Sequence, residues 1–200
     1  MSVVRKSLPL LLSLAASISS LPGLDKDKKF SPPPLDSVAT KVTNGGVTLA
    51  AIPFQTDEQA KTAFGKVNPY EHGVLPVLVM IHNDSKKAVK LDRMQVEYID
   101  RDRERIENTP AAEVPFVKPP KRPNFNPSPI PGVRLGKKNP LAAEEIEMRA
   151  WAAKMLPPGE SAHGFFYFRT GHRPGAKLYV TGLVDASSGK ELFYFETPLN

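Results

Sequence analysis

The four histidines are the residues of this sequence best suited to bind a metal ion or to exchange protons near neutral pH. They stand at positions 72, 82, 163 and 172, and no two have the spacing of three to five residues that places two ligands on one face of a helix. His82 follows one apolar run and His163 precedes another, so neighbouring strands could bring them together. We expect instead that both lie beside turns and make ordinary hydrogen bonds.

Acidic residues offer two further patterns. Asp100, Asp102 and Glu104 alternate as in a calcium loop, but arginines stand between them and the later glycine and glutamate of such a loop are missing, so a solvated hairpin tip is expected. The three glutamates at 144, 145 and 147 could act as general acids. They lie in the first turn of an expected helix, however, where the helix dipole stabilises acidic side chains, and this is a sufficient reason for their presence.

Other catalytic signatures are absent from the sequence. There is no Gly-x-Ser-x-Gly and no phosphate-binding glycine pattern. The chain has no cysteine, which excludes disulfides, thiolate nucleophiles and cysteine-based metal sites. We therefore assign no catalytic residue, metal ligand or cofactor, and expect a protein that is not an enzyme.

The basic charge gathers in one segment. Residues 117–140 hold seven prolines and six basic residues but no acidic one, which favours an extended, solvated loop. Its formal charge of +6 equals that of the whole chain. The candidate contact residues of this loop are Lys118, Lys121, Arg122, Phe125, Arg134, Lys137 and Lys138. Such a loop could attract an envelope protein or an anionic surface of lipid headgroups or acidic polysaccharide; the alternative is an insertion kept soluble by its charge.

The N-terminus indicates export. Arg5 and Lys6 precede an apolar stretch at 7–18, and small residues follow, so residues 1–20 are typical of a signal peptide cleaved near Ser19 or Ser20. An apolar stretch of twelve residues is too short for a stable membrane span. Residues 21–34 are charged and then proline-rich, which indicates a flexible leader. An exported chain without cysteine favours a bacterial periplasmic or secreted protein.

Residues 35–200 are expected to form one domain of short strands. The first strands are predicted at 38–43 and 47–53, around the turn-forming Asn44-Gly45-Gly46. A capping box from Thr56 to Gln59 predicts a helix at 57–65. An apolar run at 74–81 predicts a strand covered on both faces. Further strands are predicted at 88–91, 94–99 and 105–107.

The last third of the chain is rich in aromatic residues. Asn139-Pro140 is typical of a helix start, with the helix beginning at Leu141, whereas 149–156 fits a helix or a strand equally well. Strands are predicted at 164–168, 178–184 and 192–195. Eight of the fifteen phenylalanines and tyrosines follow residue 160, so the main core is expected there.

This pattern predicts a mostly β protein, an antiparallel β-sandwich with one or two short helices. The turn at 156–161 (LPPGES), the aromatic strand at 164–168 (GFFYF) and the strand at 178–184 (LYVTGLV) resemble the closing strands of immunoglobulin-like domains in exported bacterial proteins. The resemblance covers about forty residues. This chain lacks the cysteine pair of the antibody-like domains and places Trp151 outside the expected core strands. The resemblance implies an immunoglobulin-like module and no catalytic residue.

Two functions from different classes follow. The first is a non-catalytic exported module that binds an envelope protein or anionic surface through the basic loop. The second is a small periplasmic ligand carrier or a metal-dependent hydrolase that uses His82, His163 or His172. An assembly chaperone that lends a sheet edge to partners is a third possibility. Nucleic acid is not expected as a partner, because no aromatic stacking residues stand between the basic ones.

Overall fold

A computed structural model of the chain describes residues 30–118 and 139–199. The short helices are α1 (Asp57–Phe64), α2 (Glu144–Met148) and the 3-10 helices η1 (Leu35–Ser37), η2 (Pro69–His72), η3 (Ala111–Phe116) and η4 (Pro140–Ala142). The strands are β1 (Lys41–Asn44), β2 (Val47–Pro53), β3 (Leu75–Asn83), β4 (Val89–Lys90), β5 (Gln95–Ile99), β6 (Arg105–Glu107), β7 (Met155–Leu156), β8 (Ser161–Phe168), β9 (Lys177–Thr181), β10 (Val184–Asp185) and β11 (Phe195–Pro198).

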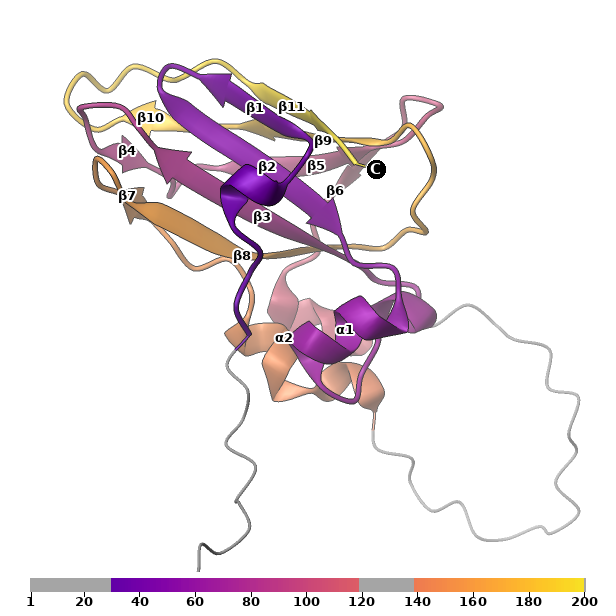
Figure 1. Cartoon of the computed structure of the whole chain (residues 1–200). Helices are drawn as coiled ribbons and strands as arrows, with labels where there is room; N and C mark the ends of the chain where they lie inside the picture. The colour runs from indigo at the N-terminus through magenta and orange to yellow at the C-terminus, as the bar shows by residue number, and fades with distance from the viewer. Residues whose placement is uncertain (1–29, 119–138, 200) are drawn as a thin grey trace, which may run out of the picture.

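The described residues form three antiparallel sheets. One four-stranded sheet has the order β1-β2-β3-β8, and the other has the order β11-β9-β5-β6. A small third sheet, β10-β4-β7, lies at one end of these two, whereas α1, α2, η2, η3 and η4 gather at another (Figure 1). The predicted mostly β class with few helices is confirmed.

The first hairpin forms where the turn residues predict it. Asn44 pairs with Val47, so Gly45 and Gly46 alone make the turn. Their φ angles of 57° and 77° lie in the left-handed region, which glycine enters without steric cost. The strand β1 begins at Lys41, where its pairing with Ala50 of β2 starts, and not at the expected residue 38, which directly follows η1.

Strand β3 is buried on both faces, as its continuous apolar sequence predicts. Alternate side chains point to opposite sides of a strand. Leu75, Val77 and others enter a core that also contains residues of the facing sheet, such as Tyr98 and Leu178. Leu78 and Met80 enter a second core on the other face of β3. The strand thus belongs to both cores of the molecule.

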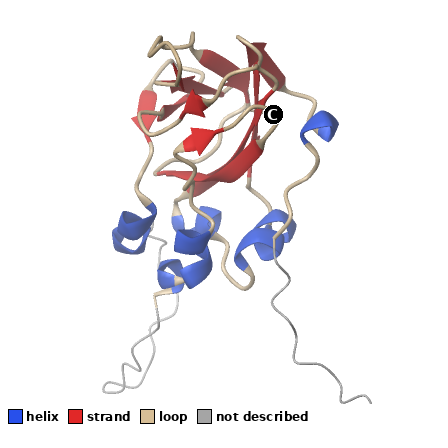
Figure 2. Ribbon diagram, turned by 90° about the vertical axis from the view of Figure 1, so that its left-hand side faces the viewer, coloured by secondary structure: helices blue, strands red, loops and turns tan. Residues whose placement is uncertain are grey.

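The second core joins the sheet to the helices. It contains Ala60, Ala63 and Phe64 of α1 together with Phe165 and Tyr167 of β8. The capping box predicted for α1 is present, since the Thr56 hydroxyl accepts the Gln59 N–H and the Gln59 side chain accepts the Thr56 N–H. Figure 2 shows α1, α2 and the neighbouring 3-10 helices side by side at one end of the strands, which we call the helical end.

Several predicted boundaries differ from the structure. Asn139 caps η4, and the longer helix α2 starts only at Glu144, because Ala143 is extended between the two. Residues 149–154 are neither helix nor strand, although Trp151 N–H donates to Phe165 O at 3.1 Å beside β8. The last strand begins at Phe195 and not at residue 192.

The expected leader packs on the domain at its described end. Phe30 lies 5.5 Å from Phe165 and 6.2 Å from Phe54, measured between ring centroids. Ring contacts at such distances are typical of packed aromatic clusters. The ordered domain therefore includes Phe30, which precedes the boundary expected at residue 35. The expected signal peptide lies outside the described residues.

Candidate functional site

The basic segment begins and ends at the helical end. Lys118 is exposed just after η3, and Asn139 is exposed just before η4. The Asn139 side-chain amide donates to Pro115 O at 2.6 Å, so the two ends of the segment are tied together. The other candidate contact residues, Lys121, Arg122, Phe125, Arg134, Lys137 and Lys138, lie outside the described residues.

Two large apolar side chains are exposed at this end. Phe116, the last residue of η3, is 80% exposed, and Met148, the last residue of α2, is 71% exposed. Single exposed apolar side chains are common on proteins, but several of them on one surface indicate a site of interaction with a partner. They mark the helical end as a candidate contact surface.

A groove runs between α1 and α2. Its volume of about 780 Å³ lies in the range of small-ligand pockets. The lining residues are Phe30, Ser31, Glu58, Lys61, Thr62, Gly65, Glu144, Glu145, Met148 and Arg149. The groove therefore combines apolar surface with charges of both signs.

His82 lies at the end of β3 away from the helical end and bridges two polar side chains. Its Nδ1 is 2.8 Å from Ser161 Oγ on β8, and its Nε2 is 2.9 Å from Asp84 Oδ1 in the following loop. When Nε2–H donates to Asp84, Nδ1 is free to accept the Ser161 hydroxyl proton. This order of serine, histidine and acid is the order of a nucleophile, a base and its orienting group.

The other histidines are not joined to His82 in a common site. His163 is two residues beyond Ser161 on β8, opposite Met80, and burial lowers its pKa. His172 lies near Tyr98, with Nδ1 3.5 Å from the Tyr98 hydroxyl, and burial lowers its pKa too. Among the described residues, no group of three or more His, Cys, Asp or Glu side chains is placed to hold a metal ion.

The acidic hairpin tip is less solvated than expected at its first residue. Asp100 is only 6% exposed, and its Oδ1 accepts the N–H groups of Asp102 and Glu104. Arg173 reaches Asp100 at 3.3 Å and Asp102 at 3.0 Å. These carboxylates therefore fold the turn and hold the β8–β9 loop.

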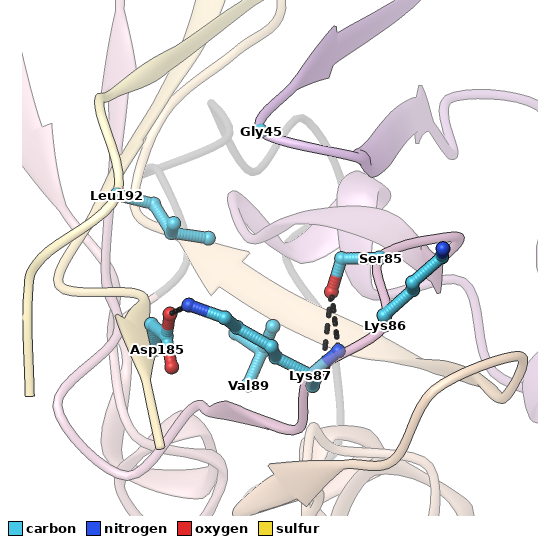
Figure 3. A pocket seen from close by; sticks show the side chains of 7 residues that line it. All are labelled: Gly45, Ser85, Lys86, Lys87, Val89, Asp185 and Leu192. Atoms are coloured by element: carbon cyan, nitrogen blue, oxygen red, sulfur yellow. Dashed lines mark hydrogen bonds and ion pairs between the residues drawn. The ribbon is translucent and has the colours of Figure 1, made fainter. Parts of the chain in front are cut away.

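A smaller pocket of 310 Å³ lies beside the third sheet (Figure 3). The lining residues are Gly45, Ser85, Lys86, Lys87, Val89, Asp185 and Leu192. Lys87 Nζ lies 2.7 Å from Asp185 Oδ2, and this contact, together with hydrogen bonds from Ser187 and Ser188, lowers the pKa of Asp185. The ammonium of the exposed Lys87 is thus paired with a carboxylate, whereas Lys86 extends away from Asp185 in Figure 3.

Reasoning from the sequence identified His82 but missed its two partners. Asp84 follows it by two residues and Ser161 comes 79 residues later, so only the pairing of β3 with β8 brings them together. The groove was missed as well, because its lining residues come from three segments that are far apart in the sequence: α1, α2 and the end of the expected leader. The single local clue was the pattern of apolar and charged residues in the two helices.

Among the described residues, no helix has the length and apolar character needed to cross a membrane.

Comparisons with known proteins find remote similarities to solved structures. No family model matches the sequence, and no curated protein matches it. One similar solved structure is a Northeast Structural Genomics Consortium target, with 12% identity and a TM-score of 0.33, and the match covers 78% of this chain and 84% of that one. Another is a functionally unknown protein from Listeria monocytogenes EGD-e, with 12% identity, a TM-score of 0.35, and coverage of 82% and 91%. Similarities this remote support no conclusion about the chain.

Proposed function

We propose that this protein is an exported, non-catalytic binding module that contacts an envelope protein or anionic surface through its helical end. The observation that carries the proposal is the exposure of Phe116 and Met148 at the helical end, where the two described ends of the basic segment also lie. Apolar side chains together with a segment whose sequence carries six positive charges suit a partner with an apolar patch and an acidic rim.

The strand order supports an immunoglobulin-like sandwich for this module. Such domains place strands A, B and E in one sheet and strands G, F and C in the other, and variable-type domains add C′ next to C. With β2, β3 and β8 taken as A, B and E, and with β11, β9, β5 and β6 taken as G, F, C and C′, both orders agree. The extra strand β1, the third sheet and the helical end are departures from that pattern, and among the described residues no strand takes the place of D beside β8.

The test is retention of the protein by envelope fractions of its source cells. The double variant Phe116→Ser and Met148→Ser should be released at a salt concentration that still retains the wild type, because it loses apolar contact area. Deletion of residues 118–138 should leave a folded domain that is no longer retained at low salt, since six positive charges are removed.

Phe193→Ser is the matched control, because Phe193 is 73% exposed and lies between β10 and β11, outside the helical elements. Its retention should equal that of the wild type. If the double variant and the deletion are both retained like the wild type, the helical end is not the contact surface.

The arrangement around His82 supports a second candidate function, hydrolysis of an activated ester. Ser161 Oγ would attack the carbonyl carbon while its proton passes to His82 Nδ1, and the proton would then go to the leaving alcohol as the acyl–oxygen bond breaks. Water would release the acyl group in the same way. Asp84 orients the imidazole through Nε2.

Labelling with a fluorophosphonate probe tests this candidate. The wild type should be labelled at Ser161, and His82→Gln should not, because it lacks the base. Ser187→Ala, which removes an exposed hydroxyl bonded to Asp185, is the control and should be labelled like the wild type. Absence of labelling in the wild type would eliminate the hydrolase candidate and leave the binding module unaffected.

A further inference from the structure

Arg149 has a polar group that the described protein does not satisfy. Its Nε is buried and has no hydrogen-bond partner among the described residues. A buried donor that lacks a partner costs free energy, and one on a charged group costs more. Arg149 as a whole is only half-buried and lines the groove between α1 and α2, so the accessible part of its guanidinium can meet a ligand there.

The backbone of Arg149 is held in place by two elements. Its N–H donates to Glu145 O at 3.1 Å, and its carbonyl accepts the Phe165 N–H at 2.9 Å. The guanidinium carbon lies 5.3 Å from the centre of the Phe30 ring, a cation–π distance. The Arg149 guanidinium thus lies beside the Phe30 ring in the groove, and the backbone of Arg149 is held by hydrogen bonds to α2 and β8.

The groove contains charges of both signs that are not paired with each other. Lys61 and Arg149 are its cations, and Glu58, Glu144 and Glu145 are its carboxylates. Within the described parts of the chain, none of these five forms a salt bridge. A simple anion would meet three carboxylates here, and a simple cation would meet Arg149 and Lys61. A ligand with one charge of each sign avoids both conflicts.

We propose that the groove binds a zwitterionic ligand, a short peptide with free termini. Its carboxylate would receive hydrogen bonds from Arg149, its ammonium would lie among Glu58, Glu144 and Glu145, and its apolar atoms would contact Phe30 and Met148. Guanidinium and carboxylate match in geometry, so this contact should contribute most to the affinity. The volume of 780 Å³ lies within the usual range of 300–1,000 Å³ for small-molecule sites.

Calorimetric titration of the purified chain with four forms of trialanine tests the proposal. The forms are the free peptide, the N-acetyl peptide, the C-terminal amide and the peptide with both ends blocked. The free peptide should bind most tightly, and each block should weaken binding by about tenfold because one charged contact is lost. Equal affinity for all four forms, or no binding at millimolar concentration, would overturn the proposal. Unchanged affinity of the N-acetyl form would overturn the role given to the glutamates.

Variants of the groove identify the contacts. Arg149→Gln should lower the affinity for the free peptide and for the N-acetyl peptide by about tenfold, because both carry the carboxylate. The affinity for the C-terminal amide, which lacks the carboxylate, should not change. Arg101→Gln is the matched control, since Arg101 is exposed and does not line the groove. Thermal unfolding of each variant separates loss of binding from loss of folding. Equal affinities in Arg149→Gln and Arg101→Gln would remove Arg149 from the site.

This inference goes beyond the binding module proposed above, and the experiments that test the two proposals are independent of each other. The titration uses purified protein and a defined peptide, whereas the retention assay depends on the envelope partner. Phe116→Ser should affect retention alone, because Phe116 does not line the groove.

Discussion

Substitution of Gly164 by alanine should damage the contact between β8 and the chain that precedes it. A Cβ at this position would lie 2.6 Å from Trp151 Cα and 2.9 Å from Trp151 N, which are backbone atoms that cannot rotate away. Contacts this short do not persist, so residues 150–151 must move away from β8.

The expected cost has two parts. Moving this segment breaks the hydrogen bonds from Phe165 N–H to Arg149 O and from Trp151 N–H to Phe165 O, each contributing about 1 kcal/mol. Overpacking adds about 1–2 kcal/mol. The free energy of unfolding should therefore fall by about 3–4 kcal/mol, which lowers the melting temperature by roughly 6–16 °C in a domain of this size.

Urea denaturation followed by tryptophan fluorescence measures the change, because Trp151 lies at the disturbed contact. Gly171→Ala is the matched control, since its added Cβ would lie 3.9 Å from the Tyr70 hydroxyl, an ordinary contact. It should change stability by less than about 0.5 kcal/mol. If Gly164→Ala were as stable as Gly171→Ala, the close approach of residue 151 to β8 would be wrong.

Three further predictions concern other contacts. Tyr167→Phe should cost about 2 kcal/mol in a denaturant titration, because the Tyr167 hydroxyl donates to the buried Ile146 O at 2.6 Å; an unchanged midpoint would contradict that bond. Thr56→Ala should lower the melting temperature through a loss of about 1 kcal/mol at the N-cap of α1, whereas Thr56→Ser should restore most of it. Burial lowers the pKa of His172 below 6.5, so the unfolded chain binds more protons and stability is lost as the pH falls below that value. His172→Gln should therefore lose less unfolding free energy between pH 7 and pH 5 than the wild type, and an equal loss would exclude His172 as the cause.

Local patterns in the sequence predicted the elements that local physics determines. Gly45-Gly46 fixed the first turn because both positions need a positive φ. The reciprocal hydrogen bonds of Thr56 and Gln59 fixed the start of α1. The short apolar run of β3, rich in β-branched residues and bounded by turn-forming residues, indicated a strand with two buried faces.

Features that depend on distant contacts could not be predicted in this way. Trp151 lies beside β8 without belonging to a strand, and nothing local to residues 149–154 specifies that position. Phe30 follows a charged stretch, yet its ring packs against Phe165, 135 positions later in the sequence numbering. The groove and the partners of His82 depend on such long-range contacts, which explains why composition and spacing pointed to the basic segment and not to them.

The position of β3 between two cores has a consequence for how the molecule comes apart. Loosening the helices would expose Leu78 and Met80, and separating the sheets would expose Leu75 and Val77 of the same strand. Loss of either the helices or the facing sheet would remove packing that holds β3 in place for the other. The described domain should therefore unfold in one cooperative step, without an earlier unfolding of its helices.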